Sequence, residues 1–287
     1  MAGLAAVLTA LMVSQTPTPI DLQGHRGARG LAPENTLPGF ERALAIGVDT
    51  LELDVGVTRD GVVVIHHDRR LNPDLARGPD GKWVTAPAPT IFSLSFRELQ
   101  HYDVGRIRPG SEYARRFPHQ KPVDGTRIPR LADLFAQVKD SKVRFNIETK
   151  LIAEAPGETL APEPFARALL AEVRKAGVAT RTTIQSFDWR TLKLVEREAP
   201  EIRTAYLTSG KASDPAKVHA ARGRVWSPSF QDLDEDKLRA ARSLGLTLVV
   251  WTVNEPADIR RVLEMQVDGI ISDYPDRVKE ELKRWRR

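Results

Sequence analysis

The chain has 287 residues, of which 41% are hydrophobic and 28% charged, and it contains no cysteine. This length suits one large domain or two small ones, and the lack of cysteine excludes disulfides, thiolate metal sites and thiol nucleophiles. The 43 basic and 38 acidic residues are interleaved, with a net charge of +5. This pattern indicates a mixed surface without the basic stripe of a nucleic-acid-binding protein, so no nucleic-acid partner is expected.

The first segment, 1–19, is predicted to be a signal peptide or a tail outside the folded domain, which would then cover 20–287. Residues 2–13 form an apolar run whose length suits the core of a signal peptide and is too short to span a bilayer. No lysine or arginine precedes Arg26, and no small-x-small cleavage motif is present. We expect a periplasmic or secreted protein without stable membrane insertion, and a cytoplasmic location is the alternative.

Short apolar runs then alternate with amphipathic stretches to the end of the chain. Strands are expected at 20–24, 50–55, 143–148, 182–186, 203–207, 224–227, 247–252 and 269–272. Helices are expected between them, for example at 131–139, 164–176, 189–198, 234–243 and 256–265. Eight strands that alternate with helices predict an α/β fold with a parallel sheet, which at eight strands can close into a (β/α)8 TIM barrel of about 250 residues.

One segment interrupts this alternation. A short extra strand is expected at 62–65, and the chain over 69–127 is then rich in proline, glycine and charge. A long segment of this kind is usually functional or disordered, so we interpret it as a cap inserted on the catalytic face between strands two and three. Before it, Asn35 or Thr36 is expected to cap the first helix and Gly47 to end it.

Carboxylates gather at the ends of the second and third predicted strands, where TIM barrels place their active sites. In the second, LELDV at 51–55, alternation puts Glu52 and Asp54 on one face. Two adjacent carboxylates repel each other unless a cation or a proton lies between them, and oxygen ligands suit Mg²⁺ or Ca²⁺. Glu148 can supply a third carboxylate and Lys150 points the same way, although an ion pair at an exposed strand end is the alternative.

Histidines and an arginine complete the candidate site. His25 and Arg26 follow the first strand in a glycine-rich loop and suggest an acid/base group beside an anion clamp, with a structural histidine as the alternative. His66 and His67 face opposite ways along a strand, so only one of them enters the site. A divalent ion with Arg26 and Lys150 can neutralise a phosphate diester, while two histidines can act as general base and general acid.

These motifs resemble the glycerophosphodiester phosphodiesterase family. The matching segments are HRGARG (25–30), APENT (32–36), GVDTLELDV (47–55), TRDG (58–61), HD (67–68), NIETK (146–150), QSF (185–187), WTVN (251–254) and DGIISDYP (268–275). The resemblance covers residues 20 to 280, and its early part is highly specific. It implies a TIM barrel with an inserted cap and hydrolysis of glycerophosphodiesters to an alcohol and glycerol 3-phosphate.

The resemblance also implies a role for each site residue. The acid/base pair would be His25 and His67. One divalent cation, Mg²⁺ or Ca²⁺, would be bound by Glu52, Asp54 and Glu148. The substrate's own glycerol 2-hydroxyl is the expected nucleophile and would give a cyclic phosphate that water then opens, with direct attack by water as the alternative.

The remaining roles concern the substrate. Arg26 and Lys150 would bind its phosphate, and Trp251 would line its pocket or fill a layer of the barrel core. The other histidines are expected at the surface: His101, His119 and His219. Two alternative functions remain: a sphingomyelinase D-like phospholipase that acts on lipid headgroups, and a non-catalytic phosphodiester-binding barrel. The alcohol that leaves and the oligomeric state are open.

Overall fold

The computed structural model describes residues 19–151 and 153–285, and the predicted signal peptide or tail lies almost wholly outside them. Eight parallel strands form a closed barrel in which β1 pairs with both β2 and β9. A further strand, β3, pairs antiparallel with β2. The nine strands are β1 Asp21–Gly24, β2 Thr50–Val57, β3 Val63–Ile65, β4 Arg144–Thr149, β5 Thr182–Ser186, β6 Arg203–Thr208, β7 Val225–Pro228, β8 Thr247–Val250 and β9 Gly269–Ser272. The predicted (β/α)8 barrel is confirmed.

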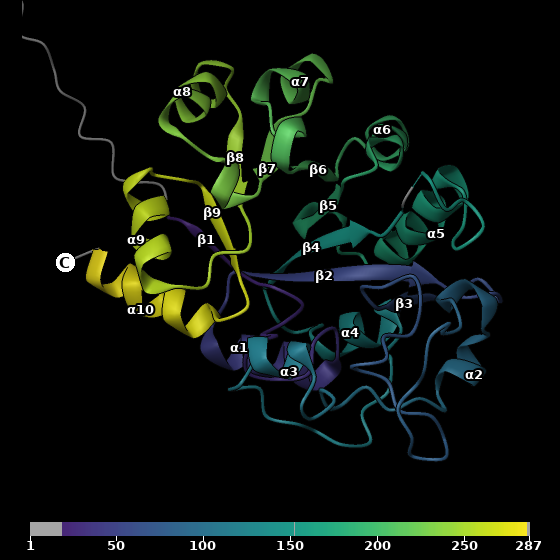
Figure 1. The fold of residues 1–287 in the computed structure, drawn as a ribbon. Coiled ribbons are helices and arrows are strands. Elements are labelled where there is room, and N and C mark those ends of the chain that lie inside the picture. The colour runs from purple at the N-terminus through teal and green to yellow at the C-terminus, as the bar shows by residue number, and fades with distance from the viewer. Residues whose placement is uncertain (1–18, 152, 286–287) are drawn as a thin grey trace, which may run out of the picture.

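Helices surround the strands (Figure 1). They are α1 Leu37–Ile46, α4 Leu131–Gln137, α5 Pro162–Lys175, α6 Trp189–Glu198, α7 Pro215–Ala220, α8 Glu235–Ser243, α9 Pro256–Glu264 and α10 Pro275–Trp285. Helix α7 lies between β6 and β7, where a helix was expected without stated bounds, and α10 was absent from the predicted elements. None of the helices in the described part of the chain is long and apolar enough to cross a membrane.

The structure selects one of two predicted helix caps and shortens one predicted strand. Thr36 caps α1 by accepting a hydrogen bond from the Gly39 N–H, whereas Asn35 takes a positive φ of 52° and turns its amide toward Asp54. The strand expected at 247–252 ends at Val250, because only an isolated bridge between Ser229 and Trp251 continues its pairing with β7.

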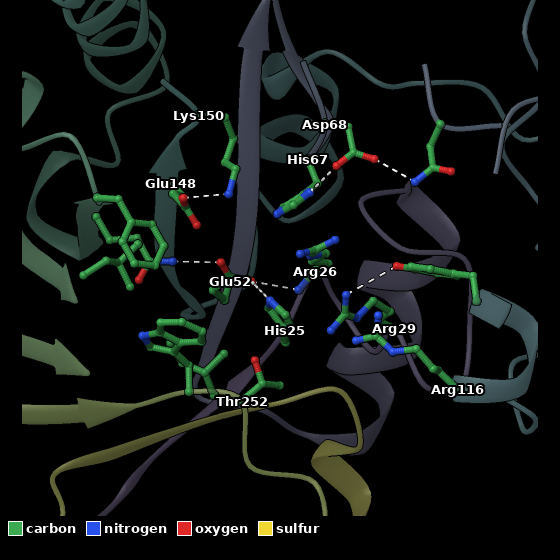
Figure 2. A pocket seen from close by; sticks show the side chains of 17 residues that line it. His25, Arg26, Arg29, Glu52, His67, Asp68, Arg116, Glu148, Lys150 and Thr252 are labelled. Carbon is green, nitrogen blue, oxygen red and sulfur yellow. Dashed lines mark hydrogen bonds and ion pairs between the residues drawn. The ribbon is translucent and has the colours of Figure 1, made fainter. Parts of the chain in front are cut away.

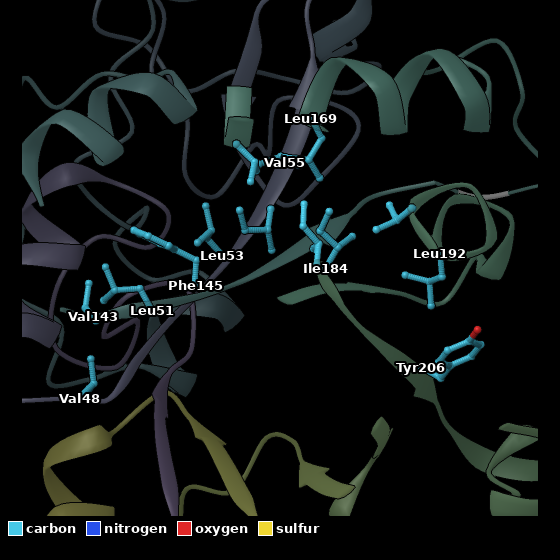
Figure 3. Packing of buried hydrophobic residues seen from close by; sticks show 14 of the residues in the cluster. Val48, Leu51, Leu53, Val55, Val143, Phe145, Leu169, Ile184, Leu192 and Tyr206 are labelled. Carbon is cyan, nitrogen blue, oxygen red and sulfur yellow. The ribbon is translucent and has the colours of Figure 1, made fainter. Parts of the chain in front are cut away.

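Alternation along the strands divides apolar from polar side chains. Leu51, Leu53 and Val55 of β2 point out of the barrel and are fully buried against side chains such as Phe145 and Ile184 (Figure 3). Burial of each such side chain contributes about 1.5–3 kcal/mol. This apolar layer between strands and helices fixes the register of β2. Glu52 and Asp54, which alternate with these three residues, must therefore point into the barrel.

The barrel interior has a polar half and an apolar half. On the side of β1, β2, β4 and β5, the Asn146 amide donates to Gln23 and Gln185, and the Gln185 amide donates in turn to Glu52 over 2.8 Å. On the side of β6 to β9 the interior is lined by Ala205, Val225, Val249 and Ile271. The acidic groups of the site are therefore supported by hydrogen-bonded side chains in the polar half of the barrel interior.

The segment between β3 and α4 contains the short helices α2 (Phe96–Leu99) and α3 (Glu112–Arg116). It has a small core of its own, which includes Leu71, Leu99 and Ile128. A second cluster joins it to the barrel, because Phe117 packs with Tyr274 next to β9. The insertion lies between the second and third barrel strands, β2 and β4, as predicted, and it carries α3 to the mouth of the barrel.

Candidate active site

A pocket of about 330 Å³ opens at the carboxyl ends of the strands (Figure 2). Seven of the eight predicted site residues line it, and they are His25, Arg26, Glu52, His67, Glu148, Lys150 and Trp251. The eighth, Asp54, does not line the pocket but lies in salt-bridge range of Arg26 and Lys150. Residues separated by up to 226 positions in the sequence thus meet in one cavity.

Three carboxylates form a tight buried cluster. Glu52, Asp54 and Glu148 each offer one oxygen, and these oxygens lie within 4.8 Å of one another. Glu52 and Asp54 are each only 1% exposed. Asp54 Oδ2 accepts a hydrogen bond from Asn35, but its buried Oδ1 has no hydrogen-bond partner in the described residues. A buried carboxylate oxygen that accepts no hydrogen bond, beside two further carboxylates, suits a hard divalent cation.

The pKa shifts of the three carboxylates agree with a cation site. Burial, with repulsion from Asp54, raises the pKa of Glu52 well above its usual range. Burial also raises the pKa of Glu148, although Lys150 opposes that shift. Burial acts on Asp54 as well, but electrostatic interactions with His67, Arg26 and Lys150 hold its pKa well below the usual range. A bound divalent cation would remove the repulsion and stabilise all three carboxylates in their ionised form.

Two cationic side chains, Arg26 and Lys150, lie next to the carboxylate cluster. Arg26, in the left-handed region at φ 50°, donates its backbone N–H to Glu52 over 2.9 Å and one guanidinium N–H to Glu34 over 2.7 Å. Its buried Nε has no hydrogen-bond partner in the described part of the chain. Lys150 donates to Glu148 over 2.7 Å and lies 3.7 Å from Asp54. Both cations thus lie where an oxyanion bound above the carboxylates would be held.

His25 is oriented by a carboxylate from the last barrel strand. Its Nδ1 lies 2.6 Å from Oδ1 of Asp273, and its Nε2 lies 3.8 Å from Glu52. Burial and the positive charge of Arg29 lower the pKa of His25 to about 4, while the charges of His25 and Arg29 hold the pKa of buried Asp273 well below its usual range. An ionised carboxylate only accepts hydrogen bonds, so the proton of the neutral ring is on Nδ1 and the lone pair of Nε2 is free for chemistry.

His67 is held in a similar way on the other side of the cluster. Its Nδ1 lies 2.6 Å from Asp68, whose other oxygen accepts a hydrogen bond from Asn72 over 2.7 Å. The hydrogen bond and charge of His67 outweigh burial and lower the pKa of Asp68, so its carboxylate is ionised. As predicted, His67 enters the pocket, and His66 is packed away with its Nε2 3.4 Å from the Arg70 carbonyl.

Two aromatic side chains, Trp251 and Phe187, form part of the pocket lining. Trp251 and Phe187 meet edge to face with their ring centroids 5.5 Å apart. Trp251 lines the cavity and also packs against the apolar half of the barrel. The histidines expected at the surface are exposed: His101, His119 and His219.

Several residues around the pocket were not singled out from the sequence. Asp273 follows β9 directly, so the strand-end rule applied to Glu52 and Glu148 would have found it. Arg29 donates to both oxygens of Asp273, over 2.6 and 3.0 Å. Tyr113 of α3 donates to Glu34, and no local pattern in the insertion marks it.

Taken together, the barrel and the polar pocket at its mouth are those of a phosphoric diester hydrolase, an enzyme that cleaves phosphate diesters. The model of the glycerophosphoryl diester phosphodiesterase family matches residues 25–277, and the chain belongs to this family.

Individual relatives agree with this assignment. The glycerophosphodiester phosphodiesterase of Caldanaerobacter subterraneus subsp. tengcongensis is 29% identical over 254 residues, which cover 88% of this chain and 93% of the relative. A crystal structure from Silicibacter pomeroyi DSS-3, assigned to the glycerophosphoryl diester phosphodiesterases, has a TM-score of 0.89 and 37% identity, and the match covers 94% of this chain and 95% of that one. A phosphodiesterase of Oleispira antarctica, solved with the product sn-glycerol-3-phosphate, shares the fold at a TM-score of 0.73 and 21% identity, with coverage of 93% and 97%.

Proposed function

We propose that the protein hydrolyses glycerophosphodiesters to an alcohol and glycerol 3-phosphate, with one divalent cation and a pair of histidines. The observation that carries this proposal is the buried cluster of three carboxylates with a carboxylate-held histidine on each side of it. Binding alone requires neither an acid nor a base, so this arrangement favours catalysis over a purely binding barrel. The product found with the Oleispira antarctica phosphodiesterase agrees with glycerol 3-phosphate as one product.

The residues that would hold the cation are Glu52, Asp54 and Glu148. Their fit is supported by the buried Oδ1 of Asp54, which has no hydrogen-bond partner in the described residues, and by the mutual repulsion of the three carboxylates. When bound, a divalent cation supplies positive charge that polarises the phosphate and stabilises the charge that develops in the transition state. All-oxygen ligands suit both Mg²⁺ and Ca²⁺.

In the first proton transfer, His25 would act as the general base. Its Nε2 is unprotonated at neutral pH, because the ring is neutral and its proton lies between Nδ1 and Asp273. Nε2 can therefore take the proton of the attacking hydroxyl, and Asp273 then stabilises the imidazolium that results. Arg29 keeps Asp273 in place by binding both of its oxygens.

In the second proton transfer, His67 would act as the general acid. As general acid His67 would be in its imidazolium form, with its Nδ1–H donated to the ionised Asp68, and its Nε2–H would then pass a proton to the departing alkoxide. Arg26 and Lys150 would bind the nonbridging oxygens of the phosphate. Trp251 would pack against the carbon chain of the substrate.

The attacking hydroxyl is proposed to be the 2-hydroxyl of the substrate's own glycerol, which gives a cyclic phosphate that water then opens. Single-turnover reactions followed by ³¹P NMR test this route. A transient cyclic phosphate supports it, and direct conversion of the diester to the monoester without that signal contradicts it in favour of attack by water.

The catalytic roles are tested by single-turnover release of glycerol 3-phosphate from glycerophosphoglycerol. The His25→Ala and His67→Ala variants are each expected to lose about 100- to 10,000-fold in rate. His219→Ala changes an exposed histidine of α7 and is the matched control, expected to keep the wild-type rate. Wild-type rates in both site variants, with their folding verified by circular dichroism, would refute the acid/base assignment.

We also propose that residues 1–19 direct export and that 20–287 form the mature domain. The proposal is supported by the apolar run at 2–13 and by the first strand beginning at Asp21. Mass spectrometry of the protein from its native host tests it. A mature mass that lacks the leader supports export, and an intact amino terminus in the cytoplasmic fraction contradicts it.

A further inference from the structure

One cation that lines the pocket has no acidic partner among the residues that the structure describes. His25, Arg26, Arg29, His67, Arg116 and Lys150 are the basic residues that line the cavity. Each of the others lies within 4.0 Å of a carboxylate oxygen, for example Arg29 at 2.6 Å from Asp273. Arg116, the last residue of α3, has no carboxylate within 4.0 Å anywhere in 19–151 or 153–285. Its charge is therefore available to a ligand.

The position of Arg116 is fixed by the packing of α3 against the barrel. Tyr113, one turn earlier, donates a hydrogen bond to Glu34 and lies 3.3 Å from Arg29 Nη1. The Phe117 ring supports both guanidinium groups, with Arg29 4.6 Å and Arg116 5.6 Å from its centroid. In Figure 2, Arg116 extends from α3 toward the pocket on the side of Arg29. Two guanidinium groups around one ring repel each other, and an anion bound near them relieves this repulsion.

The depth of the cations separates their roles. The side chains of Arg26 and Lys150 are 10% and 18% exposed, and both touch the carboxylate cluster at the floor of the pocket. Arg116 is exposed and lies on the insertion at the rim. A phosphate held at the floor is thus bound by other residues, and Arg116 faces the part of the substrate that projects from the pocket.

We infer that Arg116 forms a second anion subsite, which selects glycerophosphodiesters whose alcohol carries a further phosphate group. This inference rests on the proposed hydrolysis of glycerophosphodiesters and names a substrate class for it. The planar guanidinium fork can donate two parallel hydrogen bonds to a phosphate, and its charge disfavours a cationic alcohol such as choline.

The test compares two substrates that differ by one charge. The first is glycerophosphoglycerol, and the second is the same molecule extended by one glycerophosphate unit, so that its alcohol carries a second phosphodiester. The wild type is expected to have the higher kcat/KM for the extended substrate. Arg116→Ala is expected to lower kcat/KM for the extended substrate about tenfold. This size lies between the effect of an exposed ion pair and that of a charge-assisted hydrogen bond. The same variant should leave kcat/KM for glycerophosphoglycerol unchanged.

Three further variants sharpen the comparison. Arg116→Glu is expected to lower kcat/KM for the extended substrate further than Arg116→Ala, and Arg116→Lys to retain most of the preference. Arg115→Ala is the matched control, because Arg115 is exposed on the same helix but donates to the Gly110 carbonyl and does not line the pocket. It is expected to behave like the wild type.

The outcomes distinguish this inference from the proposed function. Equal losses on both substrates in Arg116→Ala, or no loss on either, would overturn the second subsite while hydrolysis stands. Failure of the wild type to cleave either substrate with Mg²⁺ or Ca²⁺ present would contradict the proposed function, and the inference with it. Thermal unfolding of each variant shows whether α3 remains docked.

Discussion

Replacement of Asp273 by asparagine keeps the shape of the side chain and removes its charge. In the wild type, one carboxylate oxygen accepts from His25 and Arg29 over 2.6 Å each, and the other accepts from Arg29 over 3.0 Å and from Asn254 over 2.8 Å. In asparagine an NH₂ group replaces one of these two oxygens, and this group can only donate hydrogen bonds where the oxygen accepted them. Two effects follow, one on the tautomer of His25 and one on the buried charge of Arg29.

Both effects have a predictable size. An orienting carboxylate that no longer fixes the Nδ1–H tautomer of a catalytic histidine lowers kcat by about 1,000- to 10,000-fold. The side chains of Arg29 and Asp273 are only 7% and 2% exposed, so the lost ion pair leaves a buried charge without its counterion. This costs about 3–5 kcal/mol of unfolding free energy, which corresponds to a decrease in Tm on the order of 10 °C.

Asp268→Asn is the matched control. Asp268 precedes β9 at the opposite end of the barrel, where it pairs with Arg242 at 2.7 Å and accepts from the Leu248 N–H. The control is expected to lose stability without losing kcat. Both variants are assayed for glycerol 3-phosphate release well below their Tm values. A folded Asp273→Asn variant with the wild-type kcat would refute the assigned role of Asp273 in orienting His25.

Three further predictions concern pH, the leaving group and the metal. The folded-state pKa of Asp273 is depressed, so its ionised carboxylate stabilises the folded protein. This stabilisation is fully present above the ordinary carboxyl pKa of about 3.9 and is lost as the pH falls from that value toward the folded-state pKa. In urea unfolding, the stability difference between wild type and Asp273→Asn should therefore stay constant near neutral pH and shrink in acid; a constant difference down to pH 3 would argue against the depressed pKa. His67→Ala should lose about 100- to 10,000-fold on glycerophosphoglycerol but little on a p-nitrophenyl diester, whose leaving group needs no proton; equal losses on both esters would exclude His67 as the acid. Saturating Mg²⁺ or Ca²⁺ should stabilise the wild type by about 2.7 kcal/mol at 100 times Kd, and Asp54→Asn should abolish most of this gain in thermal unfolding; an undiminished gain would place the ion elsewhere.

The parts of the site that follow strand alternation could be predicted from the sequence. Leu51, Leu53 and Val55 must face the helices, and this local constraint alone directs Glu52 and Asp54 into the barrel. Alternation identifies the residues on one face without knowledge of the rest of the fold. For the same reason the bounds of β5 and β9 agree with the prediction to the residue.

The remaining parts depend on contacts between distant segments. Asp273 meets His25 across 248 positions, and only barrel closure between β9 and β1 brings the two together. Tyr113 and Arg116 reach the pocket because the insertion packs on the barrel, and a segment without periodic pattern gives no sign of such packing. Helix α7 has only six residues, too few for a clear helical period. Helix α10 was missed although Val278 and Leu282 have helical spacing.

The central claim is metal-dependent hydrolysis at the Glu52, Asp54 and Glu148 cluster. Its most direct test is glycerol 3-phosphate release from glycerophosphoglycerol and glycerophosphocholine by the purified protein, before EDTA treatment, after it, and after Mg²⁺ or Ca²⁺ is restored. We predict release that EDTA abolishes and that one of the two ions restores. Release that continues unchanged in EDTA, or no release from either substrate with either ion, would contradict the claim.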